Sequence, residues 1–165
     1  MATSLDFLKK VVNNSNIRAA MLTVRTTEGT TAKDGYNYLF GSDPKNEIRF
    51  TDFSKHPNID RQQNDYSSTA AGAYQILYNT WLNLCEIYGF TDFTADTQDL
   101  MFCALLDQHN MLNKVVNGYF MTTFVQQTLG GIWASLPLSP YGQPTHSIKD
   151  VSSIYTANGG EIVTV

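Results

Sequence analysis

Apolar residues recur at intervals of three and four along most of the chain, a spacing typical of amphipathic helices. This spacing predicts helices over residues 5–12, 17–28, 70–88, 111–116, 119–129 and 148–158, and a further helix that begins after Thr94. Ser4 and Thr94 are candidate N-caps, and Gly89 and Gly159 are candidate stop signals. The chain is therefore predicted to be mainly helical.

Strand signals are confined to one place. Two aromatic-rich runs, at residues 36–40 and 47–50, flank a polar turn and predict a short antiparallel hairpin as the only sheet of consequence. Residues 51–68 and 137–146 are polar, show little periodicity, and predict two surface loops of the kind that often carry function. No repeat or linker divides the chain, so we expect residues 1–165 to form a single α+β domain.

Composition narrows the choice of partners. The chain has 11 Lys and Arg against 15 Asp and Glu, and its only adjacent basic pair is Lys9 and Lys10, which disfavours nucleic acid. Charged residues make up only 16%, and a surface rich in neutral hydrogen-bonding groups suits sugars. No apolar run approaches the length of a bilayer, and residues 1–10 lack the apolar stretch of a signal peptide. We therefore expect synthesis in a cytoplasm and no stable membrane insertion.

Metal and thiol chemistry are not indicated by the pattern. The three His, at positions 56, 109 and 146, lie far apart, and no zinc or phosphate-loop motif is present, so we expect neither a metal nor an organic cofactor. Cys85 and Cys103 lie in apolar helical patterns without a CxxC partner, which predicts two buried, reduced thiols. His109 is predicted to be a surface or packing residue, and Trp133 a core residue.

Glu28 is the acidic residue that the pattern singles out. It continues the apolar stripe that residues 17–24 form on one helix face, so its carboxyl is predicted to lie on the core side. Gly29 follows as a helix stop, which places the carboxyl near the negative end of the helix dipole. Both surroundings favour the protonated form, which is the form that a general acid needs. The alternative is a terminal Glu that turns to solvent.

A second carboxylate is missing from its usual place. Cleavage of a glycosidic bond normally uses two carboxyls, one as acid and one as nucleophile or base. Phage lysozymes that use water place an Asp nine residues after the acid, and this chain has Asn37 there. The first acids after Glu28 are Asp34, Asp43 and Asp52.

Several short runs share their order and spacing with those of one known family. They are Thr27-Glu28-Gly29-Thr30, Asp34-Gly35-Tyr36 with Gly41, residues 50–57 (FTDFSKHP), residues 68–75 (STAAGAYQ), and residues 132–137 (IWASLP) with Tyr141, Gly142, Gln143 and His146. Together they resemble the endolysin family typified by phage lambda, soluble lytic transglycosylases that cleave peptidoglycan. In that family the first run is the catalytic motif, and the runs at 50–57 and 132–146 are the upper and lower lips of the cleft. The likeness covers about residues 17–160.

The resemblance implies a lysozyme-like α+β fold, mainly helical, with a small antiparallel sheet lining a substrate cleft. It also accounts for the missing Asp, because in a lytic transglycosylase the C6 hydroxyl of the substrate attacks instead of water. Glu28 would protonate the oxygen of the MurNAc–GlcNAc β-1,4 bond and then take the proton of that hydroxyl as the 1,6-anhydro ring closes. The alternatives are a hydrolytic muramidase with Asp34 or Asp52 as second carboxylate, and a non-catalytic glycan-binding or virion protein.

The resemblance and the loop positions together nominate a set of substrate-binding residues. They are Tyr36, Asp52, His56, Ser68, Thr69, Tyr74, Gln75, Tyr141, Gln143 and His146. The alternative for the loop residues is anchoring of the loops. The chain departs from the family member compared, which has Gly, Arg and Glu, at Ala70, Ala73 and Thr145. The expected partner is the glycan strand of peptidoglycan, bound by a monomer that waits in the host cytoplasm until a holin opens the way to the wall.

Overall fold

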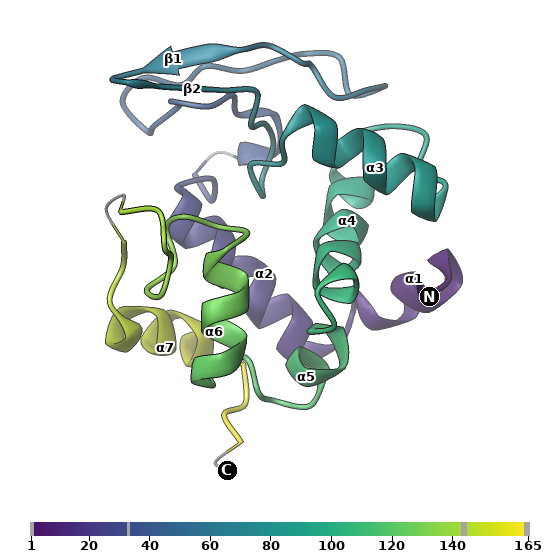
Figure 1. The fold of residues 1–165 in the computed structure, drawn as a ribbon, viewed down its shortest axis with the longest axis vertical. Coiled ribbons are helices and arrows are strands. Elements are labelled where there is room, and N and C mark those ends of the chain that lie inside the picture. Colours follow the sequence, from purple (N-terminus) through teal and green to yellow (C-terminus); the bar gives the residue numbers. More distant parts are fainter. Residues whose placement is uncertain (1, 33, 143–144, 164–165) are drawn as a thin grey trace.

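The computed structural model describes residues 2–32, 34–142 and 145–163, and in this part it contains seven α-helices and a two-stranded sheet (Figure 1). The elements are α1 (Leu5–Val11), α2 (Ser15–Glu28), a 3-10 turn (Gly35–Asn37), β1 (Arg61–Gln63), β2 (Tyr66–Ser68), α3 (Tyr78–Tyr88), α4 (Ala95–Gln108), α5 (Leu112–Val116), α6 (Thr123–Gly130) and α7 (Ile148–Ala157). The predicted α+β class is confirmed. None of the helices in the described ranges is long and apolar enough to cross a membrane.

Helix boundaries follow local capping chemistry. The Ser4 side chain accepts a hydrogen bond from the Phe7 N–H at the start of α1, and the Thr94 side chain caps α4. Helix α2 begins two residues earlier than predicted, because the side-chain oxygen of Asn14 accepts from the N–H groups of Asn16 and Ile17. The predicted helix over 119–129 is shorter in the structure, where α6 begins at Thr123.

Helix α2 runs through the middle of the molecule. It packs against α4, α5 and α7, and its apolar face, which includes Ile17, Ala20 and Val24, is fully buried. In Figure 1 the hairpin β1–β2 and α3 lie on one side of α2, whereas α6, α7 and the chain that follows α6 lie on the other. The C-terminal end of α2 therefore lies between two groups of elements.

The predicted position of the hairpin is wrong, because the sheet forms at residues 61–68, within the segment predicted to be a loop. Its strands pair antiparallel, and Asn64 in the turn has a φ of 54°, a left-handed conformation that Asn tolerates. Both faces of this hairpin are largely exposed, so it carries no apolar alternation. The aromatic runs make only isolated bridges, Tyr38 to Arg49 and Leu39 to Ala71, and therefore form no ladder.

The helix predicted over 70–88 is correct only in its second part, since α3 begins at Tyr78. Residues 70–77 form a tight turn in which Gly72 has a φ of 84° and Gln75 a φ of 49°. A Cβ on Gly72 would lie 2.3 Å from Oε1 of Gln98, so only glycine fits there. Tyr74 and Leu77, three positions apart, gave a helical spacing although both belong to this turn, in which Tyr74 is buried and Leu77 is 48% exposed.

Candidate active site

Glu28 is the last residue of α2, and Gly29 ends the helix in the left-handed conformation with a φ of 75°. The Glu28 side chain is half-buried and lines a cavity of about 470 Å³. One wall of this cavity comes from the β2 side, with Tyr66 and Ser68, and the other from residues 131–134 and Tyr141 after α6. The fold thus brings a carboxyl to the boundary between its two groups of elements.

Burial raises the pKa of Glu28 from 4.5 to about 7, and a hydrogen bond from Ser135 lowers it in part. The negative end of the α2 dipole also disfavours the ionised form. The predicted placement on the core side, with a raised pKa, is confirmed by this geometry. A carboxyl with such a pKa is protonated in a substantial fraction of molecules near neutral pH, so it can donate a proton.

The Ser135 hydroxyl links Glu28 to the backbone of α2. Its Oγ lies 3.0 Å from Oε1 of Glu28 and 3.0 Å from Oγ1 of Thr27, which in turn donates to the Val24 carbonyl at 3.0 Å. Because a hydroxyl has one proton, Ser135 donates to Glu28 when that carboxyl is ionised and can donate to Thr27 when it is protonated. Within the described ranges Oε2 of Glu28 has no hydrogen-bond partner, which leaves this oxygen for a substrate.

Glu28 is the only Asp or Glu among the described residues that line this cavity. Asp34 lines a separate cavity together with Asn37, and the Asn37 side chain donates to the Phe50 carbonyl and accepts from Arg49. Asp52 is exposed, and hydrogen bonds from the hydroxyl and N–H of Ser54 lower its pKa. Neither Asp34 nor Asp52 is therefore placed beside Glu28.

Three of the nominated substrate residues line the Glu28 cavity, namely Ser68, Gln75 and Tyr141. Tyr141 is 53% exposed and donates from its hydroxyl to the Gly131 carbonyl at 2.5 Å, which ties its loop to the end of α6. Thr69 does not line the cavity and accepts a hydrogen bond from the Tyr78 N–H at the start of α3. Gln143 lies outside the described residues.

The remaining nominated residues lie outside the Glu28 cavity, and burial contradicts the predicted sugar contact of two of them. His56 is only 1% exposed, and Tyr74, at 0%, is covered in the same way although it stands in the wall of a neighbouring cavity, so neither side chain offers free surface to a sugar. The His56 ring donates from Nε2 to the Ile76 carbonyl and accepts from the Asn58 N–H, and burial lowers its pKa. Loop position suggested a ligand contact for His56, whereas its ring is an internal anchor.

Tyr36 and His146 also lie outside this cavity. The Tyr36 hydroxyl donates to Asp99 at 2.8 Å, and its ring lines the separate cavity near Asp34. His146 is half-buried, and its backbone N–H donates to the Ser135 carbonyl at 3.0 Å. The loop that carries His146 therefore supports the segment that positions Ser135.

Some lining residues were not nominated from the sequence. Tyr66, 53% exposed, lies in a polar segment that was predicted to be a loop, so its sequence gave no sign of a strand beside the cavity. Leu77 also lines the cavity, but its spacing placed it inside a predicted helix. Trp133 is 2% exposed, donates from Nε1 to the Tyr74 carbonyl and stacks on Phe102, which confirms its assignment to the core. Its position at the cavity wall could not be read from the apolar pattern.

The positions that depart from the family pattern differ in their surroundings. Ala70 lines the Glu28 cavity, Ala73 is fully buried and donates from its N–H to Gln98, and Thr145 is exposed. Cys85 and Cys103 are both free thiols, as predicted, but only Cys103 is buried and Cys85 is half-buried. No cluster of His, Cys, Asp or Glu in the described part of the chain is arranged to hold a metal ion.

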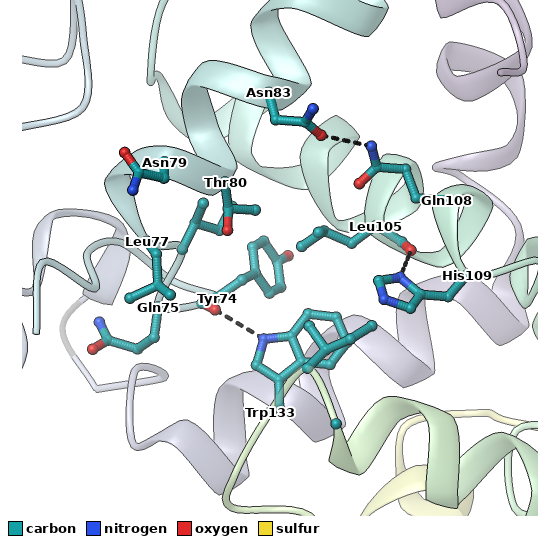
Figure 2. A pocket seen from close by; sticks show the side chains of 13 residues that line it. Tyr74, Gln75, Leu77, Asn79, Thr80, Asn83, Leu105, Gln108, His109 and Trp133 are labelled. Carbon is teal, nitrogen blue, oxygen red and sulfur yellow. Dashed lines mark hydrogen bonds between the residues drawn. The ribbon is translucent and has the colours of Figure 1, made fainter.

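A second chamber, of about 440 Å³, adjoins the first and shares five residues with it: Gln75, Leu77, Gly131, Ile132 and Trp133 (Figure 2). It extends toward the start of α3 and the end of α4. The two chambers together make one groove, with Glu28 in the part next to the hairpin.

Comparison with known proteins agrees with this geometry. The sequence model of the endolysin family matches residues 17–162. The chain belongs to the endolysin family. This endolysin is 31% identical to the endolysin of Escherichia phage P2, over 91% of this chain and 97% of that protein. It is 28% identical to the endolysin of Escherichia phage lambda, over 92% and 97% of the two chains.

The same family appears among solved structures. The endolysin superposes on the lysozyme of bacteriophage lambda complexed with a chitohexasaccharide with a TM-score of 0.81, at 27% identity over 91% of this chain and 97% of that one. Another structure of the lambda lysozyme gives a TM-score of 0.78 at 26% identity. The lysozyme-like fold is confirmed, and the chain is a lysozyme-like endolysin that degrades peptidoglycan.

Proposed function

We propose that this endolysin is a lytic transglycosylase, which cleaves the MurNAc–GlcNAc β-1,4 bond of peptidoglycan and leaves a 1,6-anhydro ring on the muramic acid. The observation that carries the proposal is a single carboxyl, Glu28, with a pKa of about 7, in a cavity where no second carboxylate lies among the described lining residues. A reaction that needs only one carboxyl fits this arrangement.

Glu28 acts first as an acid. Its proton passes from the carboxyl oxygen to the glycosidic oxygen, and the bond between that oxygen and C1 of the muramic acid breaks as the leaving sugar departs. The Ser135 hydroxyl, 3.0 Å from Oε1, stabilises the carboxylate that this step produces. The other oxygen, Oε2, is the one available to the substrate.

Glu28 then acts as a base. The C6 hydroxyl of the muramic acid attacks C1, its proton passes to the Glu28 carboxylate, and the 1,6-anhydro ring closes while the acid is regenerated. A group whose pKa lies near the working pH suits both transfers. No water is consumed, so no protein group has to activate one.

The hydrolytic alternative needs a second carboxylate that can reach the opposite side of the sugar ring or a bound water. Asn37 occupies the position of the hydrolytic Asp, and its amide is engaged with Phe50 and Arg49. Asp34 and Asp52 do not line the Glu28 cavity. These placements favour ring closure over hydrolysis.

The walls of the cavity suit a sugar chain. Tyr66 and Tyr141, each 53% exposed, present aromatic surface at one end, and Ser68 and Gln75 supply hydroxyl and amide groups. We place the glycan along this groove. The similar lysozyme of bacteriophage lambda forms a complex with a chitohexasaccharide, which supports a sugar ligand for this fold.

Digestion of purified peptidoglycan in heavy-oxygen water tests the reaction type. Ring closure predicts muropeptides that end in 1,6-anhydro-muramic acid, carry no solvent label at C1, and are one water lighter than hydrolytic products. Mass spectrometry measures both properties, with a hydrolytic lysozyme as control. Labelled reducing ends would overturn the proposal in favour of a muramidase, and intact wall would favour a non-catalytic glycan-binding protein.

We also propose that the enzyme acts as a monomer and reaches the wall from the host cytoplasm through a lesion made by a holin. Expression in a bacterial host with and without a holin, followed by cell density, tests the route to the wall. Sedimentation of the purified protein tests the oligomeric state. Rapid lysis without the holin, or a stable dimer, would contradict this part.

A further inference from the structure

The hairpin β1–β2 carries one cation that none of the reaction steps above uses. Arg61, the first residue of β1, is the only Lys or Arg between Lys55 and Lys114 in the sequence. Its side chain is half-buried, and its Nε is buried without a hydrogen-bond partner. Because the hairpin also forms one wall of the Glu28 cavity, the face from which Arg61 projects decides what it can bind.

The strand pairing places Arg61 on the face that carries cavity residues. Arg61 lies opposite Ser68 in the antiparallel ladder, and Gln63 lies opposite Tyr66. Residues directly opposite each other project from the same face of a sheet. Ser68 and Tyr66 both line the Glu28 cavity. The Arg61 side chain therefore projects from the cavity face of the hairpin.

Contacts on the two faces agree with this assignment. On the cavity face, a Cβ on Gly41 would lie 3.6 Å from the Gln63 side chain, and the neighbouring Phe40 lines the cavity. On the opposite face, the Ser67 hydroxyl donates to Oδ2 of Asp60 at 3.5 Å. Successive side chains of a strand alternate between its faces. The acidic residue that precedes β1 therefore projects away from the guanidinium.

The Arg61 guanidinium has no counter-charge of its own. Within the described ranges it forms no ion pair and no hydrogen bond, and its Nε is shielded from solvent. A charged group that loses hydration without gaining a partner is held at a cost in free energy. A ligand carboxylate would remove this cost, because two N–H groups of a guanidinium match the two oxygens of a carboxylate. The hairpin thus presents a pair of donors that a carboxylate can occupy.

The position of Arg61 suits a group that branches from the glycan. Arg61 is not among the described residues that line the cavity, so it stands beside the space proposed for the sugar rings. In peptidoglycan the branch is the stem peptide, which is attached to the lactyl group of the muramic acid and carries carboxylates. The muramic acid is the sugar whose C1 bond breaks at Glu28, so its branch starts next to the hairpin wall.

We propose that Arg61 binds a carboxylate of the stem peptide and thereby selects glycan strands whose muramic acid carries a peptide. The inference rests on the proposed glycan substrate and adds a determinant of substrate choice to it. The contact lies away from the atoms that react, so it contributes to binding and not to the proton transfers of Glu28. A neutral chitooligosaccharide has no carboxylate and makes no such contact.

Binding of soluble peptidoglycan strands to the Glu28→Gln protein tests the proposal without turnover. In this background we expect Arg61→Gln to weaken the binding of peptide-bearing strands about tenfold in calorimetry, because a charge-assisted pair is lost. Neutral chitohexaose should bind equally with and without Arg61→Gln, which also shows that the groove is intact. The matched control is Arg18→Gln, which removes the same charge at an exposed position of α2 and should leave both affinities unchanged. Unchanged binding of peptide-bearing strands by Arg61→Gln would overturn the proposal.

Two modified strands identify the anionic group. Amidation with a carbodiimide and methylamine keeps the stem peptide but removes its carboxylate charges, so we expect weaker binding that no longer responds to Arg61→Gln. Strands stripped of peptide by an amidase keep only the lactyl carboxylate. If Arg61→Gln weakens binding of these strands as much as that of peptide-bearing strands, the contact belongs to the lactyl group and the proposal is wrong.

Failure of this inference is distinguishable from failure of the proposed function. If neither chitohexaose nor peptide-bearing strands bind, both the glycan groove and the role of Arg61 are overturned. If chitohexaose binds and Arg61→Gln has no effect on peptide-bearing strands, the groove stands and only the role of Arg61 is lost. Binding is measured without cleavage, so a hydrolytic outcome of the labelling experiment would contradict the proposed reaction while leaving this test intact.

Discussion

Two carboxyl groups, those of Asp99 and Glu28, lie near the C-terminal end of α2, and they differ in the number of hydrogen bonds that they accept. At one of them Asp99 accepts hydrogen bonds from the Tyr36 and Tyr74 hydroxyls, at 2.8 and 2.6 Å. At the other, Glu28 has Ser135 as its one hydrogen-bond partner in the described ranges. The first arrangement gives the Asp99 carboxyl two hydroxyl donors, whereas the second leaves a carboxyl whose burial favours protonation.

The surroundings of Asp99 extend the contrast. Arg25, three residues before Glu28, lies 4.4 Å from the centre of the Tyr36 ring and donates to the Thr30 carbonyl. Burial and the neighbouring Asp99 raise the pKa of Tyr36 to about 12, so its hydroxyl stays protonated and keeps donating. One face of the helix therefore holds a network that fixes the structure, and its end holds an acid that can exchange its proton.

The first prediction removes the reactive carboxyl. Glu28→Gln keeps the volume but has no transferable proton, so we expect wall clearing to fall by roughly 10²–10⁴-fold in a turbidity assay. Because the folded pKa of Glu28 is raised, ionisation weakens the fold as pH rises from 4.5 toward 7. The variant should thus gain thermal stability relative to the parent at pH 8 and match it at pH 4. Clearing near the parental rate would exclude Glu28 as the acid.

The second prediction breaks the structural network instead. Asp99→Ala leaves the buried Tyr74 hydroxyl and the half-buried Tyr36 hydroxyl without their acceptor, so the free energy of unfolding should fall by about 2–4 kcal/mol. Urea denaturation measures the loss. At a temperature where the variant is folded, its clearing rate should stay within a few-fold of the parent. A large loss of activity in folded Asp99→Ala would show that the two sites are coupled.

The third prediction alters the one partner of the acid. The Ser135 hydrogen bond lowers the pKa of Glu28, so Ser135→Ala should raise that pKa above about 7. The acid form is needed first, and the alkaline limb of the rate profile should therefore move to higher pH than in the parent. Rates measured from pH 4 to pH 9 test this, with Ser153→Ala on α7 as control. A limb that stays in place would mean that Ser135 does not tune the acid.

The fourth and smallest effect concerns the aromatic end of the groove. Tyr66→Ala removes an exposed ring from the wall of the Glu28 cavity, and we expect KM for solubilised glycan to rise several-fold while kcat changes little. The control is Tyr66→Phe, which keeps the aromatic ring and should therefore keep most of the affinity. A Tyr→Ala change at Tyr119 would not serve as control, because that ring packs against the core. Equal KM values for all three proteins would remove Tyr66 from the binding surface.

Local signals predicted most helices well and the strands poorly. The spacing of apolar residues and the caps Ser4 and Thr94 are properties of neighbouring residues, and they survive into the structure. The β1–β2 hairpin is exposed on both faces, so its sequence carries no alternation that could mark it. The turn at residues 70–77 has the apolar spacing of a helix because Tyr74 packs in the core while Leu77 lines the cavity, two separate tertiary contacts that happen to lie three positions apart.

In the candidate site, too, the sequence placed the helix residue correctly and the loop residue wrongly. The stripe on α2 and Gly29 placed Glu28 at a helix end on the core side, since helix periodicity fixes which residues share a face. Loop position and the family resemblance nominated His56 as a ligand contact, yet its ring is an internal anchor whose Nε2 donates to the Ile76 carbonyl. A polar residue in a loop can face solvent, ligand or core, and the sequence pattern does not distinguish these three.

The sequence by itself determined the helical class, the end of α2 and the placement of Glu28 on the core side of that end, because capping and periodicity act between residues close in the chain. Only the tertiary structure decided the neighbours of that acid. Ser135 reaches Glu28 across 107 positions, and the second chamber forms where the start of α3 meets the end of α4. The pKa of about 7 depends on this burial, which arises when distant segments pack together.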